Sequence, residues 1–149
     1  MHDNLDMLYQ QMILDHSKHP RHFKQQENTQ GWKHETCYNP LCGDQIEVFV
    51  NLDGDNIESL LFSGHGCAIC IASASLMSSV LQSTTITHVK SVFDWFQHEL
   101  TGQPIPEGSV KLDKLSILLG VKQFPMRVKC ATCGWHALLG ALNAQKNQT

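Results

Sequence analysis

Residues 46–63 read I-E-V-F-V-N-L-D-G-D-N-I-E-S-L-L-F-S and contain two apolar segments separated by a short polar one. Segments 46–52 and 57–63 are rich in the aliphatic, β-branched and aromatic side chains that favour strands. The four residues between them, Asp-Gly-Asp-Asn, are typical of a tight turn. We therefore predict that the two segments pair as an antiparallel hairpin, whose second strand leads into Gly64-His65-Gly66-Cys67.

Outside the hairpin, helical patterns predominate, because apolar side chains recur every three or four residues. The polar residues 20–36 are predicted as a loop, with a candidate strand at about 33–38. Trp95 falls off the apolar stripe of its helix and is expected in a second packing layer. The predicted helices cover residues 5–17 after Asp3 or Asn4 as N-cap, 67–81, 86–100 after Thr85, 112–119 and 127–144, with a loop at 102–108. A few antiparallel strands and several helices predict an α+β fold, a small antiparallel sheet of about three strands packed by helices.

Length and charge restrict the function further. The 149 residues suit one domain, predicted to span 1–149, with a core that needs no disulfide or metal staple. Eleven Lys and Arg against 14 Asp and Glu, without runs of like charge, give no sign of nucleic-acid or membrane binding. The N-terminus has no signal-peptide pattern, and serines interrupt the most apolar stretch, 67–81. We therefore expect a soluble, cytoplasmic protein.

Six cysteines occur in three places along the chain. In a reducing compartment such cysteines are metal ligands or reactive thiols more often than disulfides. Two C-x-x-C pairs, Cys67 with Cys70 and Cys130 with Cys133, could form a structural four-cysteine zinc site. The second pair, however, runs directly into an amphipathic helix rather than a tight turn. A redox C-x-x-C enzyme is a further alternative, but the hairpin does not match the βαβ pattern that it requires.

The better hypothesis takes one thiol from each place. Cys42 precedes a predicted strand, Cys67 starts a predicted helix and Cys130 lies in the first turn of the last helix, so three junctions can converge at one end of the fold. Helix N-termini lower the pKa of a thiol, and the cations Arg127 and Lys129 beside Cys130 act in the same direction.

A carboxylate completes this hypothetical site. Asp44 follows Cys42 by two residues, so if the chain is already extended at Cys42, both side chains point to the same side. Gly43 between them permits turn conformations that other residues resist. Three thiolates and one carboxylate suit zinc, and the oxygen ligand is the one that leaves most readily. The sequence thus predicts a zinc site that can open.

Several motifs along the chain form a set that resembles a known family. They are Leu8-Tyr9 to His16, His19-Pro20-Arg21, Asn39-Pro40-Leu41-Cys42-Gly43-Asp44, Gly64-His65-Gly66-Cys67 and Phe124-Pro125-Met126-Arg127-Val128-Lys129-Cys130. Together they strongly resemble the SufU branch of the IscU-like, NifU N-terminal-like iron–sulfur cluster assembly proteins, over nearly the whole chain. The resemblance implies an α+β fold and a metal site of Cys42, Asp44, Cys67 and Cys130. It also implies sulfur mobilisation for cluster assembly, with a cysteine desulfurase and downstream assembly or acceptor proteins as partners.

Two departures from IscU-type scaffolds favour the SufU branch. Lys129 holds the place where those scaffolds carry a histidine, and residues 102–119 look like the additional segment of the SufU type. The resemblance therefore implies a zinc-dependent persulfide acceptor, a sulfurtransferase acting with the desulfurase rather than alone. Cys42, with the flexible Gly43 beside it, is the predicted sulfur acceptor, and Arg127 an auxiliary residue. The alternatives are a scaffold that carries a transient iron–sulfur cluster on the same ligands, and a structural zinc-binding interaction module.

The remaining thiols, Cys37, Cys70 and Cys133, are additional to the family's site, and Cys70 stands where relatives often carry serine. Each is expected to be a small buried hydrophobic side chain. His65 is a candidate substitute ligand.

Overall fold

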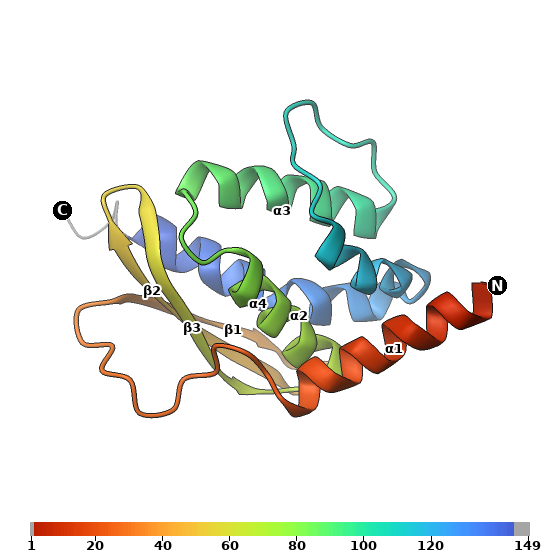
Figure 1. Cartoon of the computed structure of the whole chain (residues 1–149), viewed down its shortest axis with the longest axis horizontal. Coiled ribbons are helices and arrows are strands. Elements are labelled where there is room, and N and C mark those ends of the chain that lie inside the picture. Colours follow the sequence, from red (N-terminus) through yellow and green to blue (C-terminus); the bar gives the residue numbers. More distant parts are fainter. Residues whose placement is uncertain (1, 145–149) are drawn as a thin grey trace.

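The computed structural model describes residues 2–144, with side chains described for residues 7–143. Figure 1 shows the arrangement of the elements: one helix precedes three consecutive strands, and the remaining helices follow them. In chain order they are α1 (His2–Lys18), β1 (Lys33–Asn39), β2 (Asp44–Asp53), β3 (Asn56–His65), α2 (Ala68–Val80), α3 (Ile86–Thr101), the 3-10 helix η1 (Asp113–Gln123) and α4 (Pro125–Ala144). The predicted α+β class is confirmed.

The sheet contains three antiparallel strands in the order β1-β2-β3. The predicted hairpin forms β2 and β3, with Val48 opposite Phe62 in the middle of the ladder. The ladder reaches the Asp53–Asn56 pair, and Gly54 takes a left-handed φ of 61° in the turn between them, which glycine adopts at little cost. The candidate strand near residue 33 is confirmed as β1.

One face of the sheet is covered by helices. Along β2 the side chains alternate between buried and half-buried, with Ile46, Val48 and Val50 fully buried. These three positions share one face because strand side chains alternate. Helix α4 packs across β1 and β2, while α2 contacts both β3 and α4, and α1 packs on α2. The core therefore lies between the sheet and the pair α2 and α4.

Helices α2 and α4 approach each other very closely. A Cβ added at Gly134 of α4 would lie 3.2 Å from the Cβ of Ala74 in α2. Small residues on both sides thus allow near contact of the two backbones. Since α2 follows Cys67 and α4 contains Cys130, this contact positions two of the predicted site residues relative to each other.

The other helices differ from the predictions mainly at their ends. Helix α3 starts as predicted at the N-cap Thr85, whose hydroxyl accepts a hydrogen bond from the His88 N–H at 3.1 Å. Trp95 is buried at 4% exposure, in agreement with a second packing layer. Helix α1 already begins at His2, ahead of the predicted N-caps Asp3 and Asn4, whose side chains lie outside the described part.

The segment between α3 and α4 also departs from its prediction. A long loop leaves α3 at Gly102, rises away from the sheet in Figure 1 and leads into η1. The helix predicted at 112–119 is this 3-10 helix, Asp113–Gln123. Helix α4 starts at Pro125, two residues before the predicted Arg127, because proline suits the first turn of a helix. Within residues 2–144, no helix is both long and apolar enough to cross a bilayer.

Candidate metal centre

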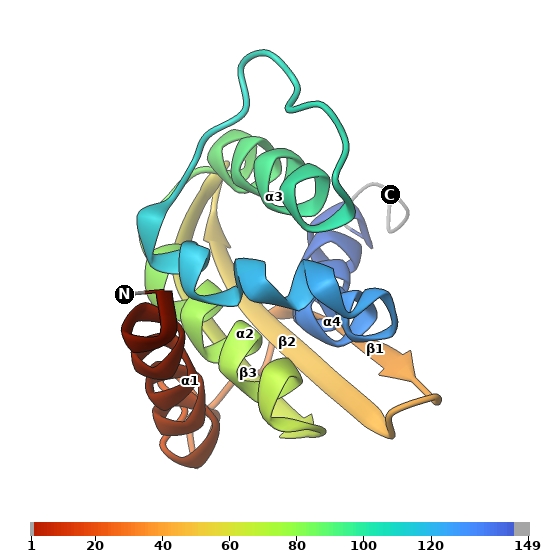
Figure 2. The ribbon, with the colours of Figure 1, turned by 90° about the vertical axis from the view of Figure 1, so that its right-hand side faces the viewer.

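Three predicted site residues come together at one end of the sheet. One donor atom each from Cys42, Asp44 and Cys130 lie within 4.8 Å of one another. Asp44 and Cys130 are buried, whereas Cys42 is half-buried. The turn between β1 and β2 and the beginning of α2 meet at this end, because the start of β2 pairs with the end of β3 (Figure 2). Two thiols and a carboxylate at this spacing can hold a metal ion such as zinc.

Cys42 reaches the site by a different route from the one predicted. The chain is not extended at Cys42, which lies in the turn between β1 and β2, where its N–H donates to the Asn39 carbonyl at 3.2 Å. Gly43 then takes a left-handed φ of 70°. The assumption of an extended strand at Cys42 was therefore wrong, and the turn at Gly43 brings the Cys42 and Asp44 side chains together.

Asp44 is held in place by two donors. Its Oδ1 accepts a hydrogen bond from the backbone N–H of Cys67 at 3.0 Å, and its Oδ2 accepts one from the Asn39 side-chain amide at 3.2 Å. A Cβ at Gly66 would lie 2.6 Å from Oδ1, so a side chain there would displace the carboxylate. The Asp44 carboxylate is thus fixed by its surroundings on two sides.

Cys67 lies where the sequence predicts, at the start of a helix. It is the N-cap of α2, with extended φ and ψ of −68° and 167°. Its sulfur lies outside the group of mutually close donor atoms, yet it is near enough to Cys130 to raise the pKa of that thiol. Cys67 is therefore adjacent to the group formed by Cys42, Asp44 and Cys130.

Cys130 differs from its prediction in two respects. Because α4 begins at Pro125, Cys130 lies beyond the first turn, away from the exposed N–H groups of the helix start. Burial raises the pKa of the Cys130 thiol, and the neighbouring Asp44, Cys42 and Cys67 raise it further. The predicted lowering by the helix N-terminus is therefore wrong, because desolvation dominates at a buried thiol.

Asn39 is a site residue that the sequence analysis missed. It is 6% exposed, and its side-chain amide donates both to Asp44 and to the Cys130 sulfur, the latter at 3.5 Å. The available signal was its position just before Pro40, at the end of a candidate strand. Its role depends on the register between β1 and β2, in which Asn39 is the partner of Asp44.

The arginine predicted as auxiliary faces the thiols. The pKa of Arg127 is raised, first by Cys67 and then by Cys130 and Cys42. Its guanidinium is therefore close to the three predicted thiol ligands while remaining exposed to solvent. His65, the candidate substitute ligand, is exposed at the end of β3 and is not part of the group in which Cys42, Asp44 and Cys130 lie together.

The three additional thiols also lie close together. Cys70 and Cys133 are buried as expected, but Cys37 is only half-buried, and all three are free. The neighbouring thiol of Cys133 raises the pKa of Cys37, and burial adds to the effect. The pKa of Cys133 rises to about 12: contact with Cys37 lowers it, but Cys70, burial and the charge of Asp44 together outweigh that effect.

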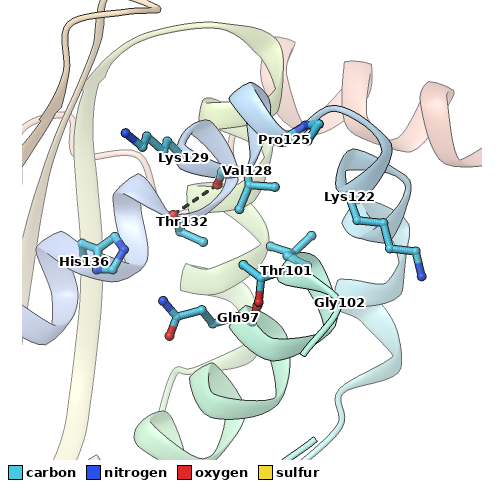
Figure 3. Close-up of a pocket in the computed structure, with 10 residues that line it drawn as sticks. Gln97, Thr101, Gly102, Lys122, Pro125, Val128, Lys129, Thr132 and His136 are labelled. Carbon is cyan, nitrogen blue, oxygen red and sulfur yellow. Dashed lines mark hydrogen bonds between the residues drawn. The ribbon is translucent and has the colours of Figure 1, made fainter. Parts of the chain in front are cut away.

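A separate cavity of about 570 Å³ lies between α3 and α4 (Figure 3). Lys129, Thr132 and His136 line it from α4, and the Thr132 hydroxyl donates to the Val128 carbonyl at 3.1 Å. Burial lowers the pKa of His136. None of the six cysteines lines this cavity, so it is distinct from the candidate metal centre.

Comparison with known proteins identifies the family. The NifU-like N terminal domain matches residues 8–131. The chain belongs to this family. It is 38% identical over 139 residues to the zinc-dependent sulfurtransferase SufU of Bacillus subtilis, with 91% of this chain and 89% of the relative covered. It is 35% identical over 143 residues to the iron–sulfur cluster assembly scaffold protein IscU of Streptococcus pyogenes, with 96% and 87% covered.

Solved structures agree with this assignment to the IscU and SufU group. A putative iron–sulfur cluster assembly scaffold protein for the SUF system, from Fervidobacterium islandicum, superposes with a TM-score of 0.80 at 32% identity, covering 91% of this chain and 97% of the other. A NifU-like N-terminal protein from Brucella abortus has a TM-score of 0.78 at 17% identity, so this comparison supports a similar fold and nothing further. The resemblance inferred from the motifs is confirmed, and with it membership of the iron–sulfur cluster assembly proteins.

Proposed function

We propose that this protein accepts sulfur from a cysteine desulfurase on Cys42, with zinc as its resident metal ion held by Cys42, Asp44, Cys67 and Cys130. The observation that carries this proposal is the convergence of Cys42, Asp44 and Cys130 within 4.8 Å. Similarity to a zinc-dependent sulfurtransferase supports the choice of metal. Zinc, when bound, keeps its cysteine ligands in the thiolate form at neutral pH.

Cys42 suits the role of acceptor because it is the most easily released thiol. It is half-buried and lies in a turn next to the left-handed Gly43, whereas Cys130 is buried within a packed helix. The freed Cys42 thiolate attacks the terminal sulfur of the persulfide on the desulfurase. A new sulfur–sulfur bond forms at Cys42, and the bond to the desulfurase cysteine breaks, so that this cysteine leaves as a thiolate.

Arg127 and the surrounding surface fit a protein partner. The exposed guanidinium beside the thiols can attract the incoming persulfide anion or hold the Asp44 carboxylate once it is released. Leu41, Phe124 and Met126, at 69%, 60% and 71% exposure, are sequence neighbours of Cys42 and Arg127. Exposed apolar side chains next to a reactive site are typical of docking surfaces. We also infer that residues 1–149 act as a single domain, since one hydrophobic cluster joins the sheet to the helices.

A transient iron–sulfur cluster on the same side chains is the second candidate function, supported by similarity to IscU scaffolds. A structural zinc module without sulfur chemistry is the third. The test is purification without oxygen, followed by metal analysis, absorbance spectroscopy and a desulfurase assay. We expect about one zinc per chain, no visible colour and faster desulfurase turnover.

Each alternative gives a different result. Iron with visible charge-transfer bands would favour the scaffold, and zinc without any stimulation of the desulfurase would favour the structural module. The Cys42→Ser variant should abolish stimulation. Cys37→Ser is the matched control, because Cys37 lies outside the proposed ligand set.

A further inference from the structure

Four of the six thiols belong to C-x-x-C pairs, in which the second thiol follows the first by about one helical turn. We call Cys42, Cys67 and Cys130 the outer layer and Cys37, Cys70 and Cys133 the inner layer. Residues three apart on a helix lie on the same face, so Cys133 lies one turn further along α4 than Cys130, and Cys70 one turn into α2 from the N-cap Cys67. Cys37 and Cys133 are in contact, because the Cys133 thiol donates a hydrogen bond to the Cys37 carbonyl at 3.4 Å.

Asp44 lies at the boundary between the layers. The position that a Cβ would take at Gly66 is 2.6 Å from Asp44 Oδ1 and 3.2 Å from the Cys70 sulfur. Cys70 is therefore a close neighbour of the carboxylate that the proposed site uses. Cys70 thus lies beside the oxygen ligand, and the Cys133 thiol lies next to β1, where it donates a hydrogen bond to the Cys37 carbonyl at 3.4 Å.

The proposed sulfur transfer creates a need for such thiols. When Cys42 carries sulfur, the outer layer keeps two thiols, Cys67 and Cys130, together with Asp44. Zinc in proteins is usually held by four ligands, and two C-x-x-C pairs are a common set. The α2 and α4 pairs contain four such thiols, on two helices that are in close contact at Gly134 and Ala74.

We propose that Cys70 and Cys133 are reserve ligands, which hold the zinc ion together with Cys67 and Cys130 while Cys42 carries sulfur. This inference rests on the proposed function. Cys70 and Cys133 each release a proton to solvent as they bind, while Cys42 and Asp44 leave. No oxidant or reductant is involved, because the exchange changes ligands only. The second cysteine of each C-x-x-C pair thereby acquires a role in metal binding in addition to core packing.

Cobalt substitution tests the proposal without measuring activity. Cobalt(II) occupies zinc sites, and each thiolate ligand adds to its sulfur-to-metal charge-transfer absorbance. The Cys42→Ser variant imitates departure of the acceptor thiol. Without reserve ligands, its absorbance per bound cobalt should fall to about two-thirds of the parent value, since two thiolates remain of three. With reserve ligands, it should equal or exceed the parent value, up to about four-thirds when four thiolates bind.

Further variants identify the thiols responsible. In the Cys42→Ser background, adding Cys70→Ser and Cys133→Ser should lower the absorbance or release the cobalt, whereas adding Cys37→Ser should change neither. Cys37 is the matched control because it belongs to the inner layer but to neither C-x-x-C pair. If the double inner substitution prevents folding, as judged by circular dichroism, the single Cys70→Ser and Cys133→Ser changes are measured instead.

An absorbance below the parent in Cys42→Ser, or loss of its cobalt, would overturn the proposal. The proposal would also be overturned if the Cys70→Ser and Cys133→Ser substitutions left the absorbance of the Cys42→Ser variant unchanged. Failure of the proposed function looks different, because the parent protein would then bind no zinc or would not stimulate the desulfurase.

Discussion

Asn39 and Asp44 are joined twice, as backbone partners at the end of the β1–β2 ladder and through a side-chain hydrogen bond of 3.2 Å. The same Asn39 amide also reaches the Cys130 sulfur. One buried side chain thus connects a carboxylate and a thiol that lie far apart in the sequence. The geometry of the candidate metal centre therefore depends on a residue that binds no metal itself.

Asn39→Ala should weaken the site. Removing the amide leaves the buried Asp44 carboxylate with one donor fewer, which costs about 1–3 kcal/mol for a hydrogen bond to a charged group. Urea unfolding of the metal-free chain should show this loss, and zinc should exchange faster with a chelator. Asn51→Ala is the control, since Asn51 makes an exposed hydrogen bond to Glu58. Equal stability of the two variants would contradict the role of Asn39.

Gly66→Ala should disturb Asp44 directly. The new methyl group would lie 2.6 Å from Oδ1, and the carboxylate, held by Asn39 and Cys67, cannot move away freely. We expect weaker zinc binding and a loss of about 1–3 kcal/mol in stability, as for other overpacked buried positions. Gly120→Ala is the matched control, because a Cβ there meets nothing within 4 Å. Unchanged zinc affinity in Gly66→Ala would show that Asp44 is not a ligand.

Two substitutions of Asp44 should separate metal retention from sulfur transfer. Asp44→Cys replaces an oxygen by a fourth thiolate, so zinc should be retained while sulfur acceptance slows, because a sulfur must now be displaced. Asp44→Ala leaves three ligands, so zinc should be lost more easily. Zinc content and desulfurase stimulation are measured for both. If Asp44→Cys accepts sulfur as fast as the parent, Asp44 does not control opening.

Arg127→Ala should slow sulfur transfer without removing zinc. The guanidinium is exposed and contributes charge rather than packing, so the stability of the fold should stay close to that of the parent. Desulfurase stimulation should decrease, and the decrease should be smaller at high salt, where the charge is screened in the parent too. Lys122→Ala, an exposed cation at the end of η1, is the control. Equal stimulation by Arg127→Ala and the parent would exclude the auxiliary role.

Much of the fold follows from local patterns. The hairpin at 46–63, the helix after Thr85 and the helix start at Cys67 depend on turn residues, a cap and an apolar stripe, all visible in a short window. Helix ends were less predictable: Pro125 extends α4 beyond the apolar pattern. The sequence also could not show that burial would dominate the pKa of Cys130, since burial arises from packing between distant segments.

The sequence predicted that Cys42, Asp44 and Cys130 would lie close together, but it did not predict how they meet. Cys42, Asp44 and Cys130 meet as expected, although by a turn at Gly43 rather than by strand alternation. Asn39 escaped notice because its contacts depend on the register of β1 against β2. The grouping of the inner layer was not predicted either, because it requires β1, α2 and α4 to be placed together.

The contact between Gly134 and Ala74 holds α2 and α4 together at a point that is separate from the proposed metal ligands. The close approach of α2 and α4 occurs at two of the smallest residues rather than at a cysteine. Exchanging the sulfur of Cys67, at the N-cap of α2, for another donor group would therefore leave this contact unchanged. During evolution, single ligand residues can therefore change, and with them the metal ion that is bound, while the packing of the two helices is kept.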